Sequence, residues 1–377
     1  MRIVITKYNA ICNLGNNIKE VFYNALSAKS MNWEVCTNRN KNDYFAMIKT
    51  ELPTIENPDF NLRCNQLALA VLEPFNIPEL IRTKGAENIA VICATTNTGV
   101  EEYERSKNPR HAQIGNPAEF IKEFYGLKNY FTTVSTACSS GIKAFSIAKD
   151  LLETEYANTV IVIGVDSLTK VPIYGFDSLE ILSPEKSNPF SKNRKGINIG
   201  EGVAGFVLEK EGNGINILGI GETTDTYHAT TPDPEAIESI RAIENTLEEA
   251  NLLPKDIDYI NLHGTGTIAN DLMEGRAINH VFGDKTPTSS TKPLTGHCLG
   301  AAASIETALC CALIENFDRR IFPHIYDGEY DYEIPKINLA TTSTIVQKLN
   351  TCLCTSFGFG GTNTAIILQG ENKNEQV

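Results

Sequence analysis

Cys138 lies among small residues, within the stretch VSTACSSGIKAF that runs from Val134 to Phe145. The residues from Phe131 to Val134 are β-branched or aromatic and predict a strand, and apolar residues at helical spacing after the cysteine predict a buried helix. A thiol in the first turn of that helix would lie near unpaired backbone N–H groups and the positive end of the helix dipole, which favour the thiolate. We therefore expect a nucleophile at Cys138; the alternative for a single cysteine is a buried structural thiol.

His263 follows the apolar stretch Asp258 to Leu262, which predicts a buried strand. It opens the motif HGTGT, in which Thr265 and Thr267 offer hydroxyl groups to a polar ligand. Because α/β proteins bind ligands at the carboxyl ends of parallel strands, we expect this histidine to face a ligand site. A lone histidine could equally be a core residue, so the interpretation depends on its distance from Cys138.

His297 ends the motif KPLTGH and precedes a long apolar helix predicted at about residues 299–315. Lys292 lies five residues before this histidine, and Glu306 lies inside the helix. An unpaired carboxylate would be costly there, so we expect Lys292 or another buried polar group to be its partner. The glycine-rich turn SFGFGGTN, residues 356–363, has backbone N–H groups that could approach a developing oxyanion.

The segments around these motifs alternate between predicted strands and predicted helices. A continuously apolar strand at residues 159–165 follows the helix after the cysteine, which is typical of a parallel α/β unit. Residues 95–117 and 167–202 are polar or glycine-rich and predict loops. The turn EGNG at residues 211–214 predicts a connection, after which strands and helices alternate again. We therefore expect two α/β halves, with the cysteine in 1–210 and both histidines in 211–377.

The composition excludes several classes of protein. The chain has 377 residues and a net charge of -13, which argues against a general nucleic-acid or membrane-surface binder. Its ten cysteines include no CxxC pair, so we expect no metal site and a reducing compartment. The chain begins with a strand pattern and has no apolar run of ~18 residues, which predicts a cytoplasmic protein without membrane insertion.

Four motifs, STACSSG, LHGTGT, KPLTGH and SFGFGGTN, occur in this order along the chain. In these motifs and over nearly its whole length, the sequence resembles the β-ketoacyl-acyl-carrier-protein synthases of the type I and II group, within the thiolase superfamily. The resemblance implies the thiolase fold, which is two similar α/β halves in a five-layer αβαβα arrangement. It also implies a dimer, either of identical chains or with a related synthase subunit.

The resemblance implies a role for each motif residue. Cys138 would be the acylated nucleophile, and His263 and His297 the pair at which a malonyl group loses carbon dioxide. The other implied roles are a lysine beside the second histidine at Lys292, hydroxyls that hold the phosphopantetheine arm at Thr265 and Thr267, a gating and oxyanion-hole residue at Phe359, and supporting carboxyls at Glu274 and Glu306.

The implied reaction is a decarboxylative Claisen condensation. An acyl group held on Cys138 would react with malonyl-acyl-carrier protein and give a 3-oxoacyl-acyl-carrier protein in fatty-acid, polyketide or polyene synthesis. Phosphopantetheine would arrive on the acyl carrier protein, so no resident cofactor is expected. The segments 36–60 and 94–130 look shorter than is usual in the family, with ATTNTG at residues 94–99 in place of a GIGG-like turn. The acyl primer and product length therefore stay open.

Three other functions are compatible with parts of this pattern. A non-catalytic partner subunit of the chain-length-factor type would keep the fold but is favoured by loss of the nucleophile, and Cys138 is present. A degradative thiolase should have a late active-site cysteine where this chain has GFGGTN. A cysteine hydrolase would need water at the site, whereas two histidines suit enolate stabilisation.

Overall fold

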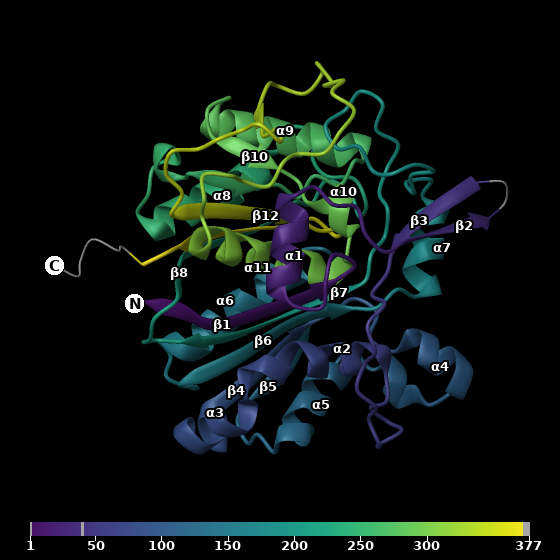
Figure 1. Ribbon diagram of the computed structural model, residues 1–377, viewed down its shortest axis with the longest axis vertical. Coiled ribbons are helices and arrows are strands. Elements are labelled where there is room, and N and C mark those ends of the chain that lie inside the picture. Colours follow the sequence, from purple (N-terminus) through teal and green to yellow (C-terminus); the bar gives the residue numbers. More distant parts are fainter. Residues whose placement is uncertain (1, 39–40, 372–377) are drawn as a thin grey trace.

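The computed structural model describes residues 2–38 and 41–371, whose strands form one large mixed sheet and a separate hairpin (Figure 1). The hairpin consists of β2 (Trp33–Asn38) and β3 (Lys41–Ala46). The large sheet has the strand order β11-β10-β9-β12-β13-β8-β1-β7-β6-β4-β5. Because β1 pairs with β8 only from Ile3 to Ile5, the sheet divides into two parts at this junction.

The first part of the sheet comes from the N-terminal half of the chain. Its strands are β1 (Ile3–Cys12), β4 (Ile89–Ala94), β5 (Phe131–Val134), β6 (Thr159–Asp166) and β7 (Gly202–Glu209). Strand β6 runs parallel to β4 and antiparallel to β7. Val160 and Val162 of β6 contribute to one core cluster, and Ile161 and Ile163 to another. The continuous apolar run therefore forms a strand that is buried on both faces.

The second part of the sheet comes from the C-terminal half. Its strands are β8 (Ile215–Thr224), β9 (Tyr259–Asn261), β10 (Pro287–Ser289), β11 (Asn338–Leu339), β12 (Thr351–Phe357) and β13 (Thr362–Gln369). Strand β9 runs parallel to its neighbours β10 and β12, whereas β13 is antiparallel to β12 and β8. The carboxyl end of β9 thus points toward the same edge as the end of β12, which brings their following turns together.

Two helices, α6 (Ser140–Glu153) and α11 (Ala302–Glu315), lie between the two parts of the sheet (Figure 1). Residues 302–314 of α11 are all buried, because a helix that is apolar on every side must be covered on every side. On the outer faces, α2 (Arg63–Leu72) and α5 (Asn116–Tyr125) cover the first part, and α8 (Ile237–Ala250) and α9 (Ile268–Phe282) cover the second. The expected five-layer α/β arrangement is confirmed.

The other elements include α1 (Ile18–Leu26), α3 (Ile77–Lys84), α4 (Val100–Ser106), α7 (Lys170–Ser178), α10 (Lys292–Thr295) and the 3-10 turn η5 (Leu299–Ala301). Helices α4 and α7 form in segments that the sequence predicted as loops. Helix α4 has two acidic residues in its first turn, which favour a helix start despite the polar composition. Among the described residues, no helix combines the length and hydropathy needed to cross a bilayer.

A boundary between the halves at residues 210 and 211 stays a proposal. It lies in the turn between β7 and β8, and the glycines of that turn have positive φ angles of 134° at Gly212 and 152° at Gly214. Yet the two halves share the middle layer, since α6 belongs to the first and α11 to the second.

Candidate active site

Cys138 lies on the turn that joins β5 to α6. Helix α6 begins at Ser140 with Ser139 as its N-cap, so the cysteine precedes the helix. The prediction that it occupies the first helical turn is therefore wrong by about two residues. Ala137 has a φ of 52°, a left-handed conformation that costs ~1–2 kcal/mol for an alanine and turns the chain sharply at the thiol. The hydroxyl of Ser356 donates to the carbonyl of Cys138 at 3.0 Å and fixes this turn to β12.

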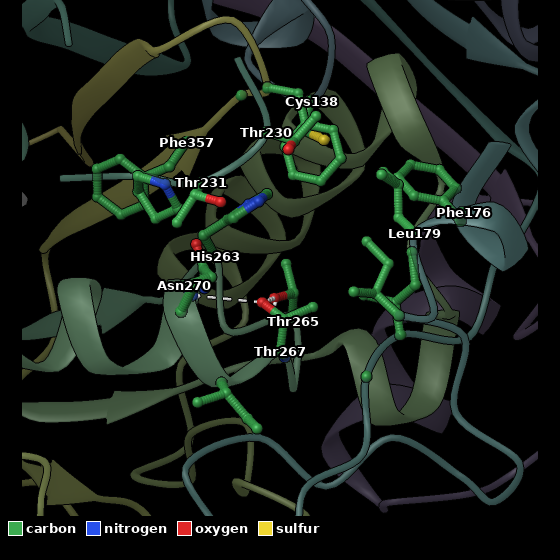
Figure 2. Close-up of a pocket in the computed structure, with 18 of the residues that line it drawn as sticks. Cys138, Phe176, Leu179, Thr230, Thr231, His263, Thr265, Thr267, Asn270 and Phe357 are labelled. Carbon is green, nitrogen blue, oxygen red and sulfur yellow. Dashed lines mark hydrogen bonds between the residues drawn. The ribbon is translucent and has the colours of Figure 1, made fainter. Parts of the chain in front are cut away.

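The three residues predicted to act together lie together. Nε2 of His297 is 3.0 Å from Sγ of Cys138, and the ring centroids of His263 and His297 are 5.4 Å apart. One ligand atom of each residue lies within 4.8 Å of the others, and all three are buried. A sulfur and two imidazoles that are far apart in the sequence therefore face one small space. Figure 2 shows Cys138 and His263 in the wall of this space.

Glu274 holds the backbone at His263. Its carboxylate accepts hydrogen bonds from the N–H groups of His263 at 2.7 Å and Gly264 at 2.6 Å, and from the hydroxyl of Thr355 at 2.9 Å. Burial raises the pKa of Glu274 to about 7, partly offset by these donors. The contacts orient the turn after β9, while the carboxyl contacts the main chain of His263 and not its ring.

Lys292 lies behind the two imidazoles. Its Nζ is 2.5 Å from Oε1 of Glu306 and 3.3 Å from Nδ1 of His263, and all three side chains are buried. Of the two alternatives that the sequence left open for the partner of Glu306, Lys292 or another buried polar group, the structure shows Lys292. Burial raises the pKa of Glu306 to about 7, and the ammonium of Lys292 lowers it in part. A buried ion pair of this kind leaves a charged donor directed at the imidazole.

The hydrogen bonds at Nδ1 determine the tautomer of each histidine. The ammonium of Lys292 can only donate to Nδ1 of His263, and the N–H of Leu299 donates to Nδ1 of His297 at 3.0 Å. Both rings therefore carry their proton on Nε2. Burial holds the pKa of both histidines well below its ordinary value, and the charge of Lys292 lowers it further. Both residues are neutral N–H donors at neutral pH.

The tautomer of the two histidines bears on whether the site suits a metal ion or a negatively charged oxygen. A thiol and two imidazoles at these separations could hold a metal ion, but metal ligation requires an unprotonated nitrogen. Here the nitrogens that face Cys138 carry protons, while the lone pairs at Nδ1 are already used. The arrangement therefore suits a ligand oxygen that develops negative charge.

The pKa of the Cys138 thiol is raised, whereas the sequence predicted a lowered pKa. Burial raises its pKa to about 12, although the charge of Lys292 and the N–H groups of Phe359 and Cys138 itself lower it in part. The prediction was wrong because it considered the helix terminus, which lowers a thiol pKa, and left out desolvation, which raises it. The Cys138 side chain is only 7% exposed. The resting cysteine is a protonated thiol with two backbone donors near its sulfur.

A pocket of about 330 Å³ leads to Cys138. Thr265, Thr267, both histidines and Phe359 line it, as the sequence predicted, whereas Lys292, Glu274 and Glu306 do not. The hydroxyls of Thr265 and Thr267 are 3.1 Å apart, and Thr267 also caps α9 through the N–H of Asn270 (Figure 2). The ring of Phe359 packs against Phe176 of α7, with centroids 5.7 Å apart.

Other residues of the pocket wall were missed by the sequence analysis. Most come from α7 and its following loop and from the loop after β8, and one comes from the start of α9; they include Phe176, Leu179, Ile181, Asp225, His228, Thr230, Thr231 and, in α9, Asn270. The signal that could have indicated the second loop is the polar run TTDTYHATTP between a strand and a helix. No spacing rule connects such a loop to Cys138 before the fold is known.

The two halves of the chain match the two sequence models of one family. The model described as Beta-ketoacyl synthase, N-terminal domain, matches residues 85–213, and the C-terminal domain model matches residues 215–324. The 3-oxoacyl-[acyl-carrier-protein] synthase 2 of Coxiella burnetii is 36% identical over 262 residues, which are 65% of this chain and 63% of that protein. Nodulation protein E of Rhizobium leguminosarum bv. trifolii is 29% identical and is covered over 98% of its length, with 97% of this chain aligned.

Solved structures show the same fold. A chain in the complex of a ketosynthase with its chain length factor from Xenorhabdus doucetiae superposes with a TM-score of 0.93 and 34% identity, covering 98% of both chains. A β-ketoacyl synthase from Burkholderia phymatum superposes with a TM-score of 0.85 at 23% identity, covering 98% of this chain and 100% of that one. With a thiolase fold, matches to both domain models and a cysteine beside two neutral histidines, this chain belongs to the β-ketoacyl synthase family.

Proposed function

We propose that this protein condenses an acyl group held on Cys138 with malonyl-acyl-carrier protein, releases carbon dioxide and forms a 3-oxoacyl-acyl-carrier protein. The observation that carries the proposal is the grouping of two buried, neutral imidazoles around one buried thiol, with Nε2 of His297 3.0 Å from its sulfur. The family membership supports an acyl-transfer reaction, and the site geometry supports the particular steps below.

In the first step, Sγ of Cys138 attacks the carbonyl carbon of the acyl thioester. The N–H groups of Cys138 and Phe359 are the donors that would stabilise the oxyanion. The carbon–sulfur bond to phosphopantetheine then breaks, and the proton of the thiol goes to the departing sulfur. Thr265 and Thr267 on the pocket wall offer hydroxyls to the phosphopantetheine arm.

In the second step, the malonyl thioester carbonyl accepts hydrogen bonds from Nε2 of His263 and His297. The bond to the carboxylate carbon breaks, carbon dioxide leaves, and the electron pair moves to the enolate. Neutral imidazoles stabilise the enolate oxygen without protonating its carbon, and Lys292 keeps them neutral because like charges oppose a second protonation nearby.

In the third step, the enolate carbon attacks the carbonyl of the acyl-Cys138 thioester. The carbon–sulfur bond to Cys138 breaks, the sulfur takes a proton from solvent water, and the 3-oxoacyl chain leaves on the carrier protein. Glu306 balances the charge of Lys292, and Glu274 holds the turn of His263, so both carboxyls support the reacting groups from behind.

The proposed partner is an acyl carrier protein that brings both thioesters on its phosphopantetheine arm. One structural neighbour, at a TM-score of 0.86, comes from a complex of a type II polyketide acyl-carrier protein with its ketosynthase. A homodimer and a heterodimer with a related synthase subunit both stay open as proposals. We place the reaction in the cytoplasm, since all ten cysteines are unpaired.

The function is tested with purified protein, malonyl-acyl-carrier protein and an acyl-loaded carrier. We expect carbon dioxide release and a 3-oxoacyl thioester by mass spectrometry. Cys138→Ala should lower condensation by at least ~10³-fold, because the nucleophile is gone, and should retain decarboxylation. The control is Cys36→Ser, which changes an exposed cysteine and should leave both rates unchanged.

Two results would change the assignment. Condensation by Cys138→Ala at the parent rate would contradict the proposed nucleophile. A parent protein that is inert alone but gains activity with a second synthase-like subunit would indicate an obligate heterodimer. Testing Cys138→Ala in that heterodimer would then show which chain carries the reaction.

A further inference from the structure

Asp166 is a buried carboxyl at the end of β6 that the proposed reaction does not use. It is 0% exposed, and its donors are neutral. The Thr95 hydroxyl lies 2.7 Å and the Thr96 N–H 2.9 Å from Oδ1, while the Thr96 hydroxyl lies 2.9 Å and the Gly300 N–H 2.7 Å from Oδ2. Burial raises the pKa of Asp166 to about 6, and these donors oppose that rise.

Gly300, whose N–H donates to Asp166, lies three residues after His297. A Cβ atom added at Gly300 would be 2.9 Å from Oδ2 of Asp166, so the approach requires glycine at this position. Leu299, just before it, has a φ of 52°, a left-handed conformation that leucine adopts at a cost of ~1–2 kcal/mol. Such a conformation persists only where surrounding contacts determine it.

The conformation of Leu299 has a direct effect at the active site. Its N–H donates to Nδ1 of His297 at 3.0 Å, which leaves the ring proton on Nε2, the nitrogen 3.0 Å from Sγ of Cys138. The orientation and tautomer of His297 thus depend on the peptide geometry between Cys298 and Gly300. Asp166 holds one end of that short segment.

We propose that Asp166 is a positioning residue for His297. By accepting the N–H of Gly300, it keeps Leu299 in the conformation that directs its N–H at Nδ1 of His297. The same carboxylate holds the loop after β4, residues 95–97, so it fixes the His297 turn to two strands of the other half. This role goes beyond the proposed function and rests on it for its catalytic consequence.

The test replaces the carboxylate with an amide of the same shape. In Asp166→Asn one oxygen becomes an NH₂ group, which must face a donor, either the Gly300 N–H or the donors of residues 95–97. We expect malonyl decarboxylation to fall by roughly 100-fold, as for a displaced catalytic group. The matched control is Glu209→Gln. Glu209 is a buried carboxyl on the neighbouring strand β7, at the end far from Asp166, where it pairs with Lys84.

A second readout separates positioning from a general loss of stability. In protein labelled with ¹⁵N-histidine, long-range ¹H–¹⁵N spectra report the tautomer of each ring, and the signal of His297 is assigned by its loss in His297→Ala. In the parent and in Glu209→Gln we expect a single Nε2–H form. In Asp166→Asn we expect mixed tautomers at His297 and an unchanged His263.

Gly300→Ala provides an independent variant in case Asp166→Asn fails to fold. Its methyl group would displace the carboxylate while keeping its charge, so it should alter the same His297 signal. An unchanged His297 tautomer in the folded variants would overturn the proposal, even if the rate falls. A parent that fails to decarboxylate malonyl thioesters would contradict the proposed function alone, because the tautomer readout needs no turnover.

Discussion

Each imidazole of the site makes a different contact at each of its two nitrogens. At Nδ1 the partner is a donor, either the ammonium of Lys292 or the N–H of Leu299, and at Nε2 the ring presents its own proton. His297 directs that proton at Cys138, and the ring of His263 lies perpendicular to it. Because both rings are neutral, they can stabilise an enolate oxygen without supplying the proton that would end the reaction.

The raised pKa of Cys138 predicts how its reactivity depends on pH. With a pKa of about 12, the thiolate fraction rises about tenfold per pH unit between pH 7 and pH 9, and the alkylation rate should rise with it and show no plateau. Iodoacetamide labelling followed by mass spectrometry measures this rate, in a Cys36→Ser background that removes the exposed cysteine. A plateau below pH 8 would mean that the donors at the sulfur outweigh its burial.

At the scale of elements, glycine lets β6 and α6 lie close to the start of α11. A Cβ atom added at Gly141 of α6 would be 2.6 Å from the backbone nitrogen of Ser304, and one at Gly164 of β6 would clash with the Ser304 side chain. The turn η5 connects His297 to α11, so this close packing also sets the distance from the imidazole to Cys138.

Gly164→Ala should therefore destabilise the protein by ~1–3 kcal/mol, the usual cost of an overpacked core. It should also slow condensation, because Ser304 must move together with η5. The matched control is Gly175→Ala in α7, where a Cβ atom would meet nothing within 4 Å. That variant should be neutral or gain up to ~1 kcal/mol from the helix propensity of alanine. Thermal unfolding and the condensation rate check both, and equal behaviour of the two variants would contradict the packing argument.

At the scale of the whole molecule, one hydrophobic cluster connects the two halves. It includes Phe145 of α6, Phe206 of β7, Leu309 of α11 and Ile366 of β13. The second half cannot cover its own middle helix alone, because α11 is buried on all sides against elements of both halves. We therefore expect the halves to unfold together although they match two separate domain models.

Leu309→Ala tests this cooperativity. Leu309 is 0% exposed, and the truncation should lower the free energy of unfolding by ~2–5 kcal/mol. Hydrogen exchange should show reduced protection in β6 and β13 alike, and Tyr332→Ala, at a residue 93% exposed, should change neither. Loss of protection confined to β13 would show that the halves are independent folding units.

The proposed reacting residues and most of the elements around them can be predicted from the amino-acid sequence. Apolar runs such as residues 159–165 identify doubly buried strands, and the four motifs identify Cys138, His263 and His297 as a set. These signals are local, since each depends on neighbours a few positions away. That Glu306 has a buried partner was also predictable, because a charge in an apolar helix requires one, whereas the choice of Lys292 came from the fold.

The protonation of the site follows from contacts that exist only in the folded chain. The tautomer of His297 depends on a left-handed Leu299 and, through Gly300, on Asp166 in the other half. The pKa of Cys138 depends on burial by segments far away in the chain, which outweighs the charge of Lys292 and the two backbone donors at the sulfur. Desolvation and hydrogen-bond direction are properties of three-dimensional surroundings, so no spacing along the chain could have given them.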